Sequence, residues 1–164
     1  MATQLSEDRI ARKFGYAPET KQTYEVYGDQ VIYTNSLVGV RDDDGTIEPV
    51  QPSTINGGPG YAAVGVSVEH SEPNPSGQNE LGTNGKRELQ IQFGRAIELD
   101  LDSADSLPSP PESALGAKAY LSSDHEFELA SDADNADVGA TVRELLAGAT
   151  DRAIVEIPDL PDQA

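Results

Sequence analysis

The side chains best suited to catalysis or metal binding are few in this chain. It has two histidines, His70 and His125, and no cysteine. Neither histidine has a second nitrogen or sulfur ligand at helical or hairpin spacing, which a zinc-type site requires. Serines are plentiful, but no G-x-S-x-G motif marks one of them as a nucleophile. We therefore predict no metal site and interpret both histidines as solvent-exposed turn residues.

The carboxylates and glycines do not single out an active site either. Asp and Glu number 29, and no pair stands apart as acid and base. The run Asp42-Asp43-Asp44 suggests calcium, but an EF-hand loop needs acids at alternate positions followed by a glycine and a distal glutamate. That spacing is absent, so the run predicts a turn. The glycine-rich loop 57–60 lacks the following GK[ST] of a phosphate-binding loop. We predict no catalytic residues, no cofactor and no enzymatic activity.

Charge is the strongest compositional signal. Against the 29 acidic residues stand 11 Lys and Arg, which gives a net charge of −18. Such self-repulsion opposes folding at ordinary ionic strength, but molar salt shortens the Debye length to about 3 Å. We therefore predict a halophilic source, an archaeon or its virus. A disordered acidic chain is the alternative, although the acids alternate with apolar residues instead of forming blocks.

The same composition bears on partners. Binding to phosphates requires clustered Lys and Arg, so we predict no direct nucleic-acid partner. The chain has no run of 18 apolar residues, so we predict no membrane insertion.

Alternation of apolar and polar residues runs through most of the chain and predicts β-strands. The clearest case is residues 88–101, ELQIQFGRAIELDL, in which Gly94 is expected to mark a bend or bulge. Residues 116–157 hold three or four further alternating segments, separated by Asp, Asn, Ser and Gly. We predict an all-β fold, a small antiparallel β-barrel or sandwich over residues 31–157, with residues 158–164 as a tail that leaves the sheet.

Residues 1–30 are predicted to form an extended N-terminal arm, with a short helix over 5–14 capped by Ser6. The first 21 residues hold four of the basic residues and only three acids, so this part is nearly neutral. An arm that docks on another, acidic subunit fits this asymmetry, and a frayed terminus is the alternative. Deleting residues 1–27 is then expected to abolish binding and leave a folded barrel. The residues predicted to contact a capsid or a neighbouring subunit are Ile10, Phe14, Tyr16, Tyr24 and Tyr27.

Five phrases follow one another along the chain: SLVGVRDDDGTIEPV, YAAVGVSVEH, RELQIQFGRAIELDL, GAKAYLSSDHEFELA and VGATVRELLAGATDRAIVEI. Within the last two, Gly116, Tyr120 and Asp124 precede a Val-Gly pair at 138–139. This order resembles that of the capsid decoration, or cement, proteins of tailed viruses, over about residues 31–157. The 70–86 loop, the proline-rich loop 102–113 and the N-terminal arm depart from that pattern.

The resemblance implies a structural virion protein. Such a protein binds the outer surface of an icosahedral capsid, forms homo-oligomers, often trimers, and stabilises contacts between major capsid subunits. The expected partners are therefore the major capsid protein and further copies of this chain. Two alternatives remain: another virion surface component such as a turret, spike or tail protein, and a salt-adapted β-domain that binds a small ligand.

Overall fold

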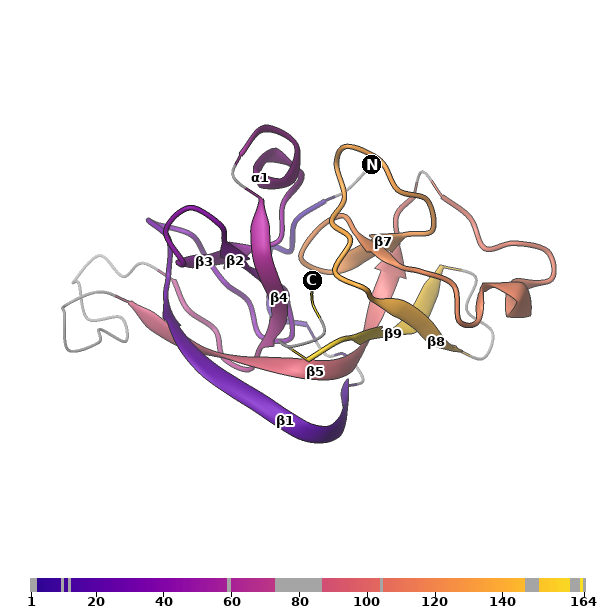
Figure 1. Ribbon diagram of the computed structural model, residues 1–164, viewed down its shortest axis with the longest axis horizontal. Coiled ribbons are helices and arrows are strands. Elements are labelled where there is room, and N and C mark those ends of the chain that lie inside the picture. The colour runs from indigo at the N-terminus through magenta and orange to yellow at the C-terminus, as the bar shows by residue number, and fades with distance from the viewer. Residues whose placement is uncertain are drawn as a thin grey trace.

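The computed structural model describes residues 3–9, 11, 13–58, 60–72, 87–103, 105–146, 151–159 and 163, with side chains for all of these except 13–20. Nearly all of its regular structure is β, which confirms the predicted all-β class (Figure 1). The strands are β1 (Lys13–Glu25), β2 (Leu37–Arg41), β3 (Ile47–Pro49), β4 (Tyr61–Ser67), β5 (Glu88–Leu101), β6 (Tyr120–Leu121), β7 (Glu126–Glu128), β8 (Thr141–Leu145) and β9 (Arg152–Ile157). The helical turns are α1 (Pro52–Gly57) and the 3-10 turn η1 (Pro111–Ala114).

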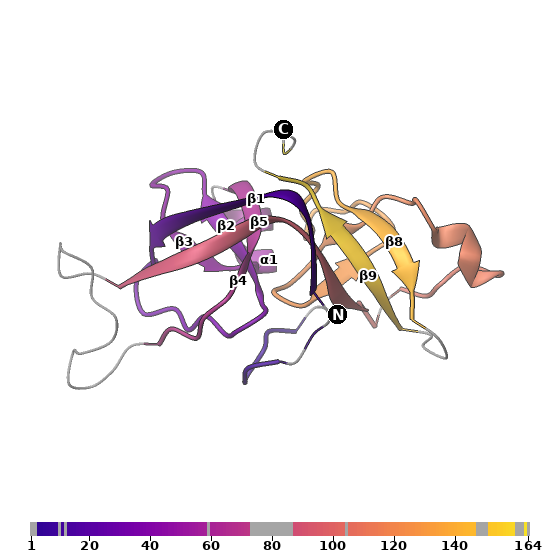
Figure 2. The same ribbon diagram turned by 90° about the horizontal axis from the view of Figure 1, so that it is seen from below.

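Strand β5 is shared by two halves of the molecule. Gln92, in its first half, pairs with both β1 and β4, and Asp100, near its end, pairs with both β7 and β9. Because a strand has two edges, and Ile97 pairs with both β1 and β9, strands β4 and β9 lie along one edge and β1 and β7 along the other. Figure 2 shows β1 and β9 on opposite sides of β5. We call β1–β4 with the first half of β5 the first lobe, and the second half of β5 with β6–β9 the second lobe.

The sheet is mixed, not wholly antiparallel as predicted. β5 and β7 run parallel, because a long connection carries the chain back to the start of β7. The sheet curls into a half-barrel (Figure 1). The bend predicted at Gly94 is present: its φ is 70°, a conformation that favours glycine, and the register of β1 shifts between Gly15 and Thr20, opposite Arg95 and Phe93.

Strands β2 and β4 are buried on both faces. One apolar cluster lies inside the first lobe and consists of Val26, Ile32, Val38, Val40, Ile47, Ala63, Leu89, Ile91 and Phe93. A larger cluster joins the two lobes, and its members include Leu37, Val64, Val66, Ile97, Leu99, Phe127, Val155 and Ile157. Successive β2 residues, Leu37 and Val38, therefore belong to different clusters, as the period of a strand requires. The two lobes share one continuous core.

Gly39 and Gly65 permit this close packing. A Cβ at Gly65 would lie 2.4 Å from Cγ2 of Ile91 and 2.7 Å from the carbonyl oxygen of Gln92. A Cβ at Gly39 would lie 2.2 Å from the ring of Tyr61. The close backbone approach expected for a glycine inside a strand is thus present at Gly65.

The N-terminal prediction is wrong in two respects. Residues 3–9 are not helical, and Lys13–Glu25 form β1, which pairs with β5 at nine positions. Weak local helix propensity gives way here to pairing with an open sheet edge, a partner that is distant in sequence. Much of the predicted arm is therefore part of the sheet, and deletion of residues 1–27 would remove a strand.

The C-terminal tail does not leave the sheet entirely. The side-chain amide of Gln163 forms hydrogen bonds with the backbone of Val64 in β4. The predicted domain boundaries at residues 30 and 157 are therefore not boundaries of the packed structure, because segments on both sides of each contact the sheet.

Candidate functional site

Residues 3–9 form a strap across the two lobes. At its start, the backbone N–H of Thr3 donates to Oε1 of Glu126 at 2.5 Å, and that of Leu5 donates to Oδ1 of Asp124 at 3.0 Å. Both acids are buried in the second lobe, in and beside the turn that joins β6 to β7. Hydrogen bonds from N–H groups to carboxylates are stronger than those between neutral groups. The two acids therefore hold the first half of the strap.

The second half of the strap is held by the first lobe and by β5. The N–H of Thr34 donates to Oδ1 of Asp8 at 2.8 Å, and Nδ2 of Asn35 donates to the carbonyl of Arg9 at 3.0 Å. Nη2 of Arg9 donates to the carbonyl of Glu98 in β5 at 2.7 Å. The strap thus adds links between the two lobes, which also meet directly where the N–H of Leu37 donates to the carbonyl of Asp124 at 2.7 Å.

Ser123, Asp124 and His125 have the residue types of a catalytic triad but not its geometry. Nδ1 of His125 lies 3.0 Å from Oδ1 of Asp124 and 3.5 Å from Oγ of Ser123. A triad needs the serine and the carboxylate on opposite ring nitrogens. In addition, Ser123 is fully buried and its hydroxyl donates to Glu126 at 3.0 Å. Of the three, Asp124 anchors the strap, and together they are not arranged for nucleophilic attack.

The histidines differ from the prediction of exposed turn residues. The side chain of His125 is only 13% exposed, because it packs against the anchoring carboxylates. His70 is half-buried, with Nδ1 2.8 Å from Asp8 of the strap and Nε2 3.4 Å from Glu72. The hydrogen bond to Asp8 is the main cause of a raised pKa for His70. In the described part of the chain, no group of three or more His, Cys, Asp or Glu residues could hold a metal ion.

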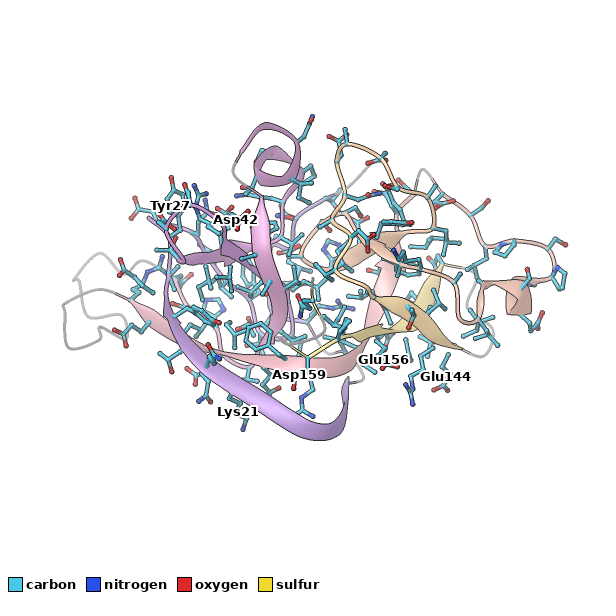
Figure 3. All side chains as sticks on the ribbon, in the orientation of Figure 1. Lys21, Tyr27, Asp42, Glu144, Glu156 and Asp159 are labelled. Carbon is cyan, nitrogen blue, oxygen red and sulfur yellow. The ribbon has the colours of Figure 1, made fainter. Side chains whose placement is uncertain are left out.

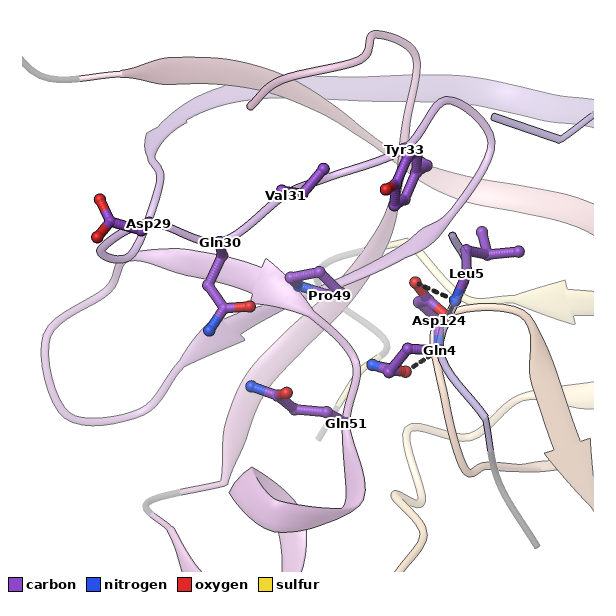
Figure 4. Close-up of a pocket in the computed structure, with 9 residues that line it drawn as sticks. All are labelled: Gln4, Leu5, Asp29, Gln30, Val31, Tyr33, Pro49, Gln51 and Asp124. Atoms are coloured by element: carbon purple, nitrogen blue, oxygen red, sulfur yellow. Dashed lines mark hydrogen bonds between the residues drawn. The ribbon is translucent and has the colours of Figure 1, made fainter. Parts of the chain in front are cut away.

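A cavity of about 370 Å³ lies where the strap meets the two lobes (Figure 4). Its walls come from four separate segments of the chain: the strap, the loop between β1 and β2, the segment from the end of β3 to the start of α1, and the turn that anchors the strap. The lining residues are Gln4, Leu5, Asp29, Gln30, Val31, Tyr33, Pro49, Gln51 and Asp124. Three of these are carboxamides and two are carboxylates, and none is Lys or Arg. We call this cavity the interlobe pocket.

The wall made by the loop between β1 and β2 is held from behind by Arg87. This residue is only 8% exposed, and its Nη2 donates to the carbonyls of Gly28 at 3.1 Å and Gln30 at 2.6 Å. Burial lowers the pKa of Arg87, and the nearby charge of Asp29 acts in the opposite direction. Farther along, Ile32 exchanges two backbone hydrogen bonds with Ser71, each of 2.8 Å. The loop is therefore fixed before any ligand binds.

The opposite wall is fixed by hydrogen bonds that its carboxamide side chains donate to neighbouring groups. Nε2 of Gln4 donates to the carbonyl of Val50 at 3.0 Å. Nε2 of Gln51 donates to Oε2 of Glu48 at 2.9 Å. Glu48 is fully buried and also receives hydrogen bonds from Arg41, Thr54 and Tyr61. It is an internal anchor with its hydrogen-bonding capacity in use, and not a free acid–base group.

The same network explains the acidic hairpin and Tyr61. The guanidinium of Arg41 lies 3.1 Å from the carboxylate of Asp43 and 3.8 Å from that of Asp44. The acidic run thus forms the predicted turn, and it folds around the Arg41 side chain. Burial, and then the charge of Glu48, raise the pKa of Tyr61.

Two of the five predicted contact residues have described side chains. Tyr24 is half-buried and packs edge-on against Phe93, with ring centroids 6.2 Å apart. Tyr27 is 38% exposed at the outer end of the first lobe (Figure 3), and the guanidinium of Arg41 lies 3.8 Å from its ring centroid. Ile10 and the side chains of Phe14 and Tyr16 lie outside the described residues. Of the two described side chains, that of Tyr27 is thus the more exposed.

The residues of the interlobe pocket were not identified from the sequence. Its three glutamines belong to no motif and lie in separate segments, so no periodicity or spacing marks them. The only sequence signal is the abundance of polar residues in predicted loops.

No protein-family model matches this chain, and no curated protein matches it. Among the described residues, no helix is long and apolar enough to cross a membrane.

Proposed function

We propose that this protein is a structural virion component that binds the outside of an icosahedral capsid and stabilises contacts between major capsid subunits. One observation about the described residues carries the proposal. The groups best suited to catalysis, in the Ser123–Glu126 turn and at Glu48, are engaged in internal hydrogen bonds that hold the strap, the hairpin and the two lobes together. The sequence order of the strands, with its likeness to decoration proteins, supplies the particular role.

Rigidity supports this role. A protein that bridges neighbouring capsid subunits opposes their separation only if its own parts do not move apart. Here a continuous core joins the lobes, and the strap adds hydrogen bonds across them. Such an arrangement suits a clamp better than it suits a pair of domains that open and close.

Charge determines how the clamp would make its contacts. With a net charge of −18, we propose a halophilic virus as the source, in which molar salt screens repulsion between acidic surfaces. Long-range attraction is screened as well, so contacts with the major capsid protein would depend on apolar burial and close hydrogen bonds. Tyr27 offers such a contact. A homotrimer is the proposed oligomer.

The proposal is tested by association with particles. Particles isolated in molar salt from the source culture are probed with an antibody against the chain, and the mass of the free protein is measured in the same salt. We expect the protein to sediment with the particles, and the free protein to have the mass of a trimer. A monomer found only in the supernatant would refute the proposal.

A pair of variants tests the contact. Tyr27 and Leu115 are the exposed large hydrophobic residues of the described part of the chain, at 38% and 48% exposure. Binding is measured on particles from which the protein has first been removed. Tyr27→Ala is expected to weaken this binding about tenfold, which is typical of the loss of an aromatic contact residue. Leu115→Ala is the matched control and should bind as the unaltered protein does. Equal effects of the two changes would reject Tyr27 as the contact.

A turret, spike or tail protein would share these features and differ in its place on the particle, which immuno-electron microscopy distinguishes.

The interlobe pocket favours a second candidate, a β-domain that binds a small ligand.

A further inference from the structure

We propose that the interlobe pocket binds a neutral polyhydroxylated ligand, a saccharide of one ring or the terminal ring of a glycan. This inference goes beyond capsid binding and does not depend on it. It rests on the chemistry of the pocket walls, the volume of the pocket and a wall residue, Gln30, whose side-chain amide makes no hydrogen bond to the described residues.

The charge of the pocket restricts the ligand. Asp29 and Asp124 line it, and no Lys or Arg does, so an anion would meet repulsion without compensation. A metal ion is also disfavoured. Figure 4 shows the two carboxylates at opposite ends of the pocket. The carboxylate oxygens of Asp124 already accept hydrogen bonds from the N–H of Leu5, and one of them lies 3.0 Å from Nδ1 of His125. An organic cation would find only Asp29, because Asp124 is engaged, and the charge of Asp29 already acts on the buried guanidinium of Arg87. A neutral ligand needs no charge partner.

The polarity of the walls indicates hydroxyl groups. Six of the nine lining residues carry a polar side chain. Three of them, Asp29, Gln30 and Tyr33, make no side-chain hydrogen bond to the described residues, so an apolar ligand would leave these three without partners. Carboxamides both donate and accept, carboxylates accept, and the phenol of Tyr33 does either. A hydroxyl group also donates and accepts, so vicinal hydroxyls match this set.

Gln30 is the residue most free to make such contacts. Its backbone carbonyl is held by Arg87, but among the hydrogen bonds of the described residues none involves its side-chain amide. The hydroxyl of Tyr33 is likewise without an internal hydrogen bond in that part of the chain. Figure 4 shows the Gln30 amide directed into the pocket, toward Gln51. The backbone of Gln30 is therefore fixed, while its side-chain amide remains available to a ligand.

The volume of the pocket fits a small sugar. About 370 Å³ corresponds to about 12 water molecules at about 30 Å³ each. A hexose has about the same number of heavy atoms, and it could replace these waters and reproduce their hydrogen bonds. For a ligand of that size, ordinary ligand efficiency puts the dissociation constant near the millimolar range.

The strap couples the pocket to the rest of the fold. Gln4 and Leu5 line the pocket from the strap, and the acids that anchor the strap include the lining residue Asp124. The pocket is therefore complete only when the strap is docked.

The experiment uses the full-length protein in molar salt. Glucose, galactose and N-acetylglucosamine are titrated against it, with glucuronate as an anionic probe and putrescine as a cationic one. Binding is followed by two-dimensional NMR, which resolves the side-chain amides of Gln4, Gln30 and Gln51. We expect at least one neutral sugar to bind and to shift the Gln30 amide, and the two charged probes to bind more weakly. A glycan array then distinguishes a free sugar from a glycan terminus.

Two variants decide the assignment. Gln30→Ala should weaken binding of the sugar about tenfold, the typical effect of losing one hydrogen bond to a ligand. Gln22→Ala removes an exposed carboxamide of β1 outside the pocket and should bind as before. No binding of any neutral sugar, equal binding by Gln30→Ala, or tighter binding of glucuronate or putrescine would overturn the proposal. Failure of capsid binding would leave these outcomes unaffected.

Discussion

The side-chain amide of Gln163 pairs with the backbone of Val64 as another strand would. The N–H of Val64 donates to Oε1 of Gln163 at 2.7 Å, and Nε2 of Gln163 donates to the carbonyl of Val64 at 2.7 Å. β4 pairs with β5 only through Val66 and Ser67, so its backbone at Val64 is not covered by β5. The C-terminal tail thus supplies the donor and the acceptor that this part of β4 lacks.

Gln163→Ala should therefore destabilise the protein by about 1–2 kcal/mol, the net value of two hydrogen bonds. Exchange of the Val64 amide with solvent should become faster, and both effects can be measured by thermal unfolding and hydrogen-exchange NMR. Gln163→Glu should be at least as damaging, because a carboxylate cannot donate to the Val64 carbonyl. Gln22→Ala, on the exposed face of β1, serves as control. Unchanged exchange at Val64 would show that the tail does not pair with β4 in solution.

Two truncations separate the strap from β1. Removal of residues 1–9 deletes the bonds to Asp124, Glu126 and Thr34 but leaves β1 in place, and should cost about 2–4 kcal/mol of unfolding free energy. Removal of residues 1–27 also deletes β1, with its nine pairs to β5, and should prevent cooperative folding. Circular dichroism and thermal unfolding in molar salt give the comparison. A cooperative transition in the longer truncation would restore the view of these residues as a separate arm.

Gly65→Ala should destabilise the protein by about 1–3 kcal/mol, because the new methyl group would overlap Ile91 and the backbone of Gln92. Gly57→Ala is a matched control: no atom lies within 4 Å of its added Cβ, and the change should be neutral or slightly stabilising. Chemical denaturation of both variants measures the difference. Equal stability of the two variants would mean that β4 and β5 are not packed so closely.

Glu128 predicts an unusual pH dependence of stability. Burial is the main cause that raises the pKa of Glu128 from 4.5 to about 7, and neighbouring Asp132 acts in the same direction. The folded state holds the proton on Glu128 more tightly than the unfolded state does. The stabilisation from this protonation is therefore fully present below about pH 4.5 and is lost as the pH rises to about 7. Unfolding free energy should therefore fall over that window on account of this group.

Glu128→Gln keeps an acceptor for Nδ2 of Asn135, which donates to Glu128 at 2.6 Å, and removes the charge. We expect the variant to be more stable at pH 8 by about 1 kcal/mol, after allowance for solvent screening, and to show a flatter profile between pH 4.5 and 7. Urea denaturation across this range measures both. A variant whose profile is parallel to that of the unaltered protein would assign the pH dependence to other groups.

Salt is the remaining test of the acidic composition. With 29 acidic and 11 basic residues, the melting temperature should rise steadily from low to molar NaCl as repulsion is screened. Sucrose at matched osmolality controls for effects of solute exclusion and should raise it less. Equal stabilisation by sucrose would contradict the proposed adaptation to salt.

The local pattern of the sequence determined the β class, the long strand at 88–101, its bend at Gly94 and the turn at 42–44. These features depend on residues close together in the chain, whose alternation or turn chemistry reports the backbone directly. The helix predicted over 5–14 failed for the same reason: its signals were local, and they were outweighed by pairing between β1 and a strand more than 60 residues away.

Only the tertiary structure decided which residues meet. Leu5 and Asp124 are 119 positions apart, and no periodicity in either segment indicates that one anchors the other. The interlobe pocket depends on four such segments, and the two-sided burial of β2 depends on which strands flank it. Pattern reports which face of a strand is apolar, whereas long-range pairing selects the neighbour that covers it, and here that selection also placed the free Gln30 amide in a pocket.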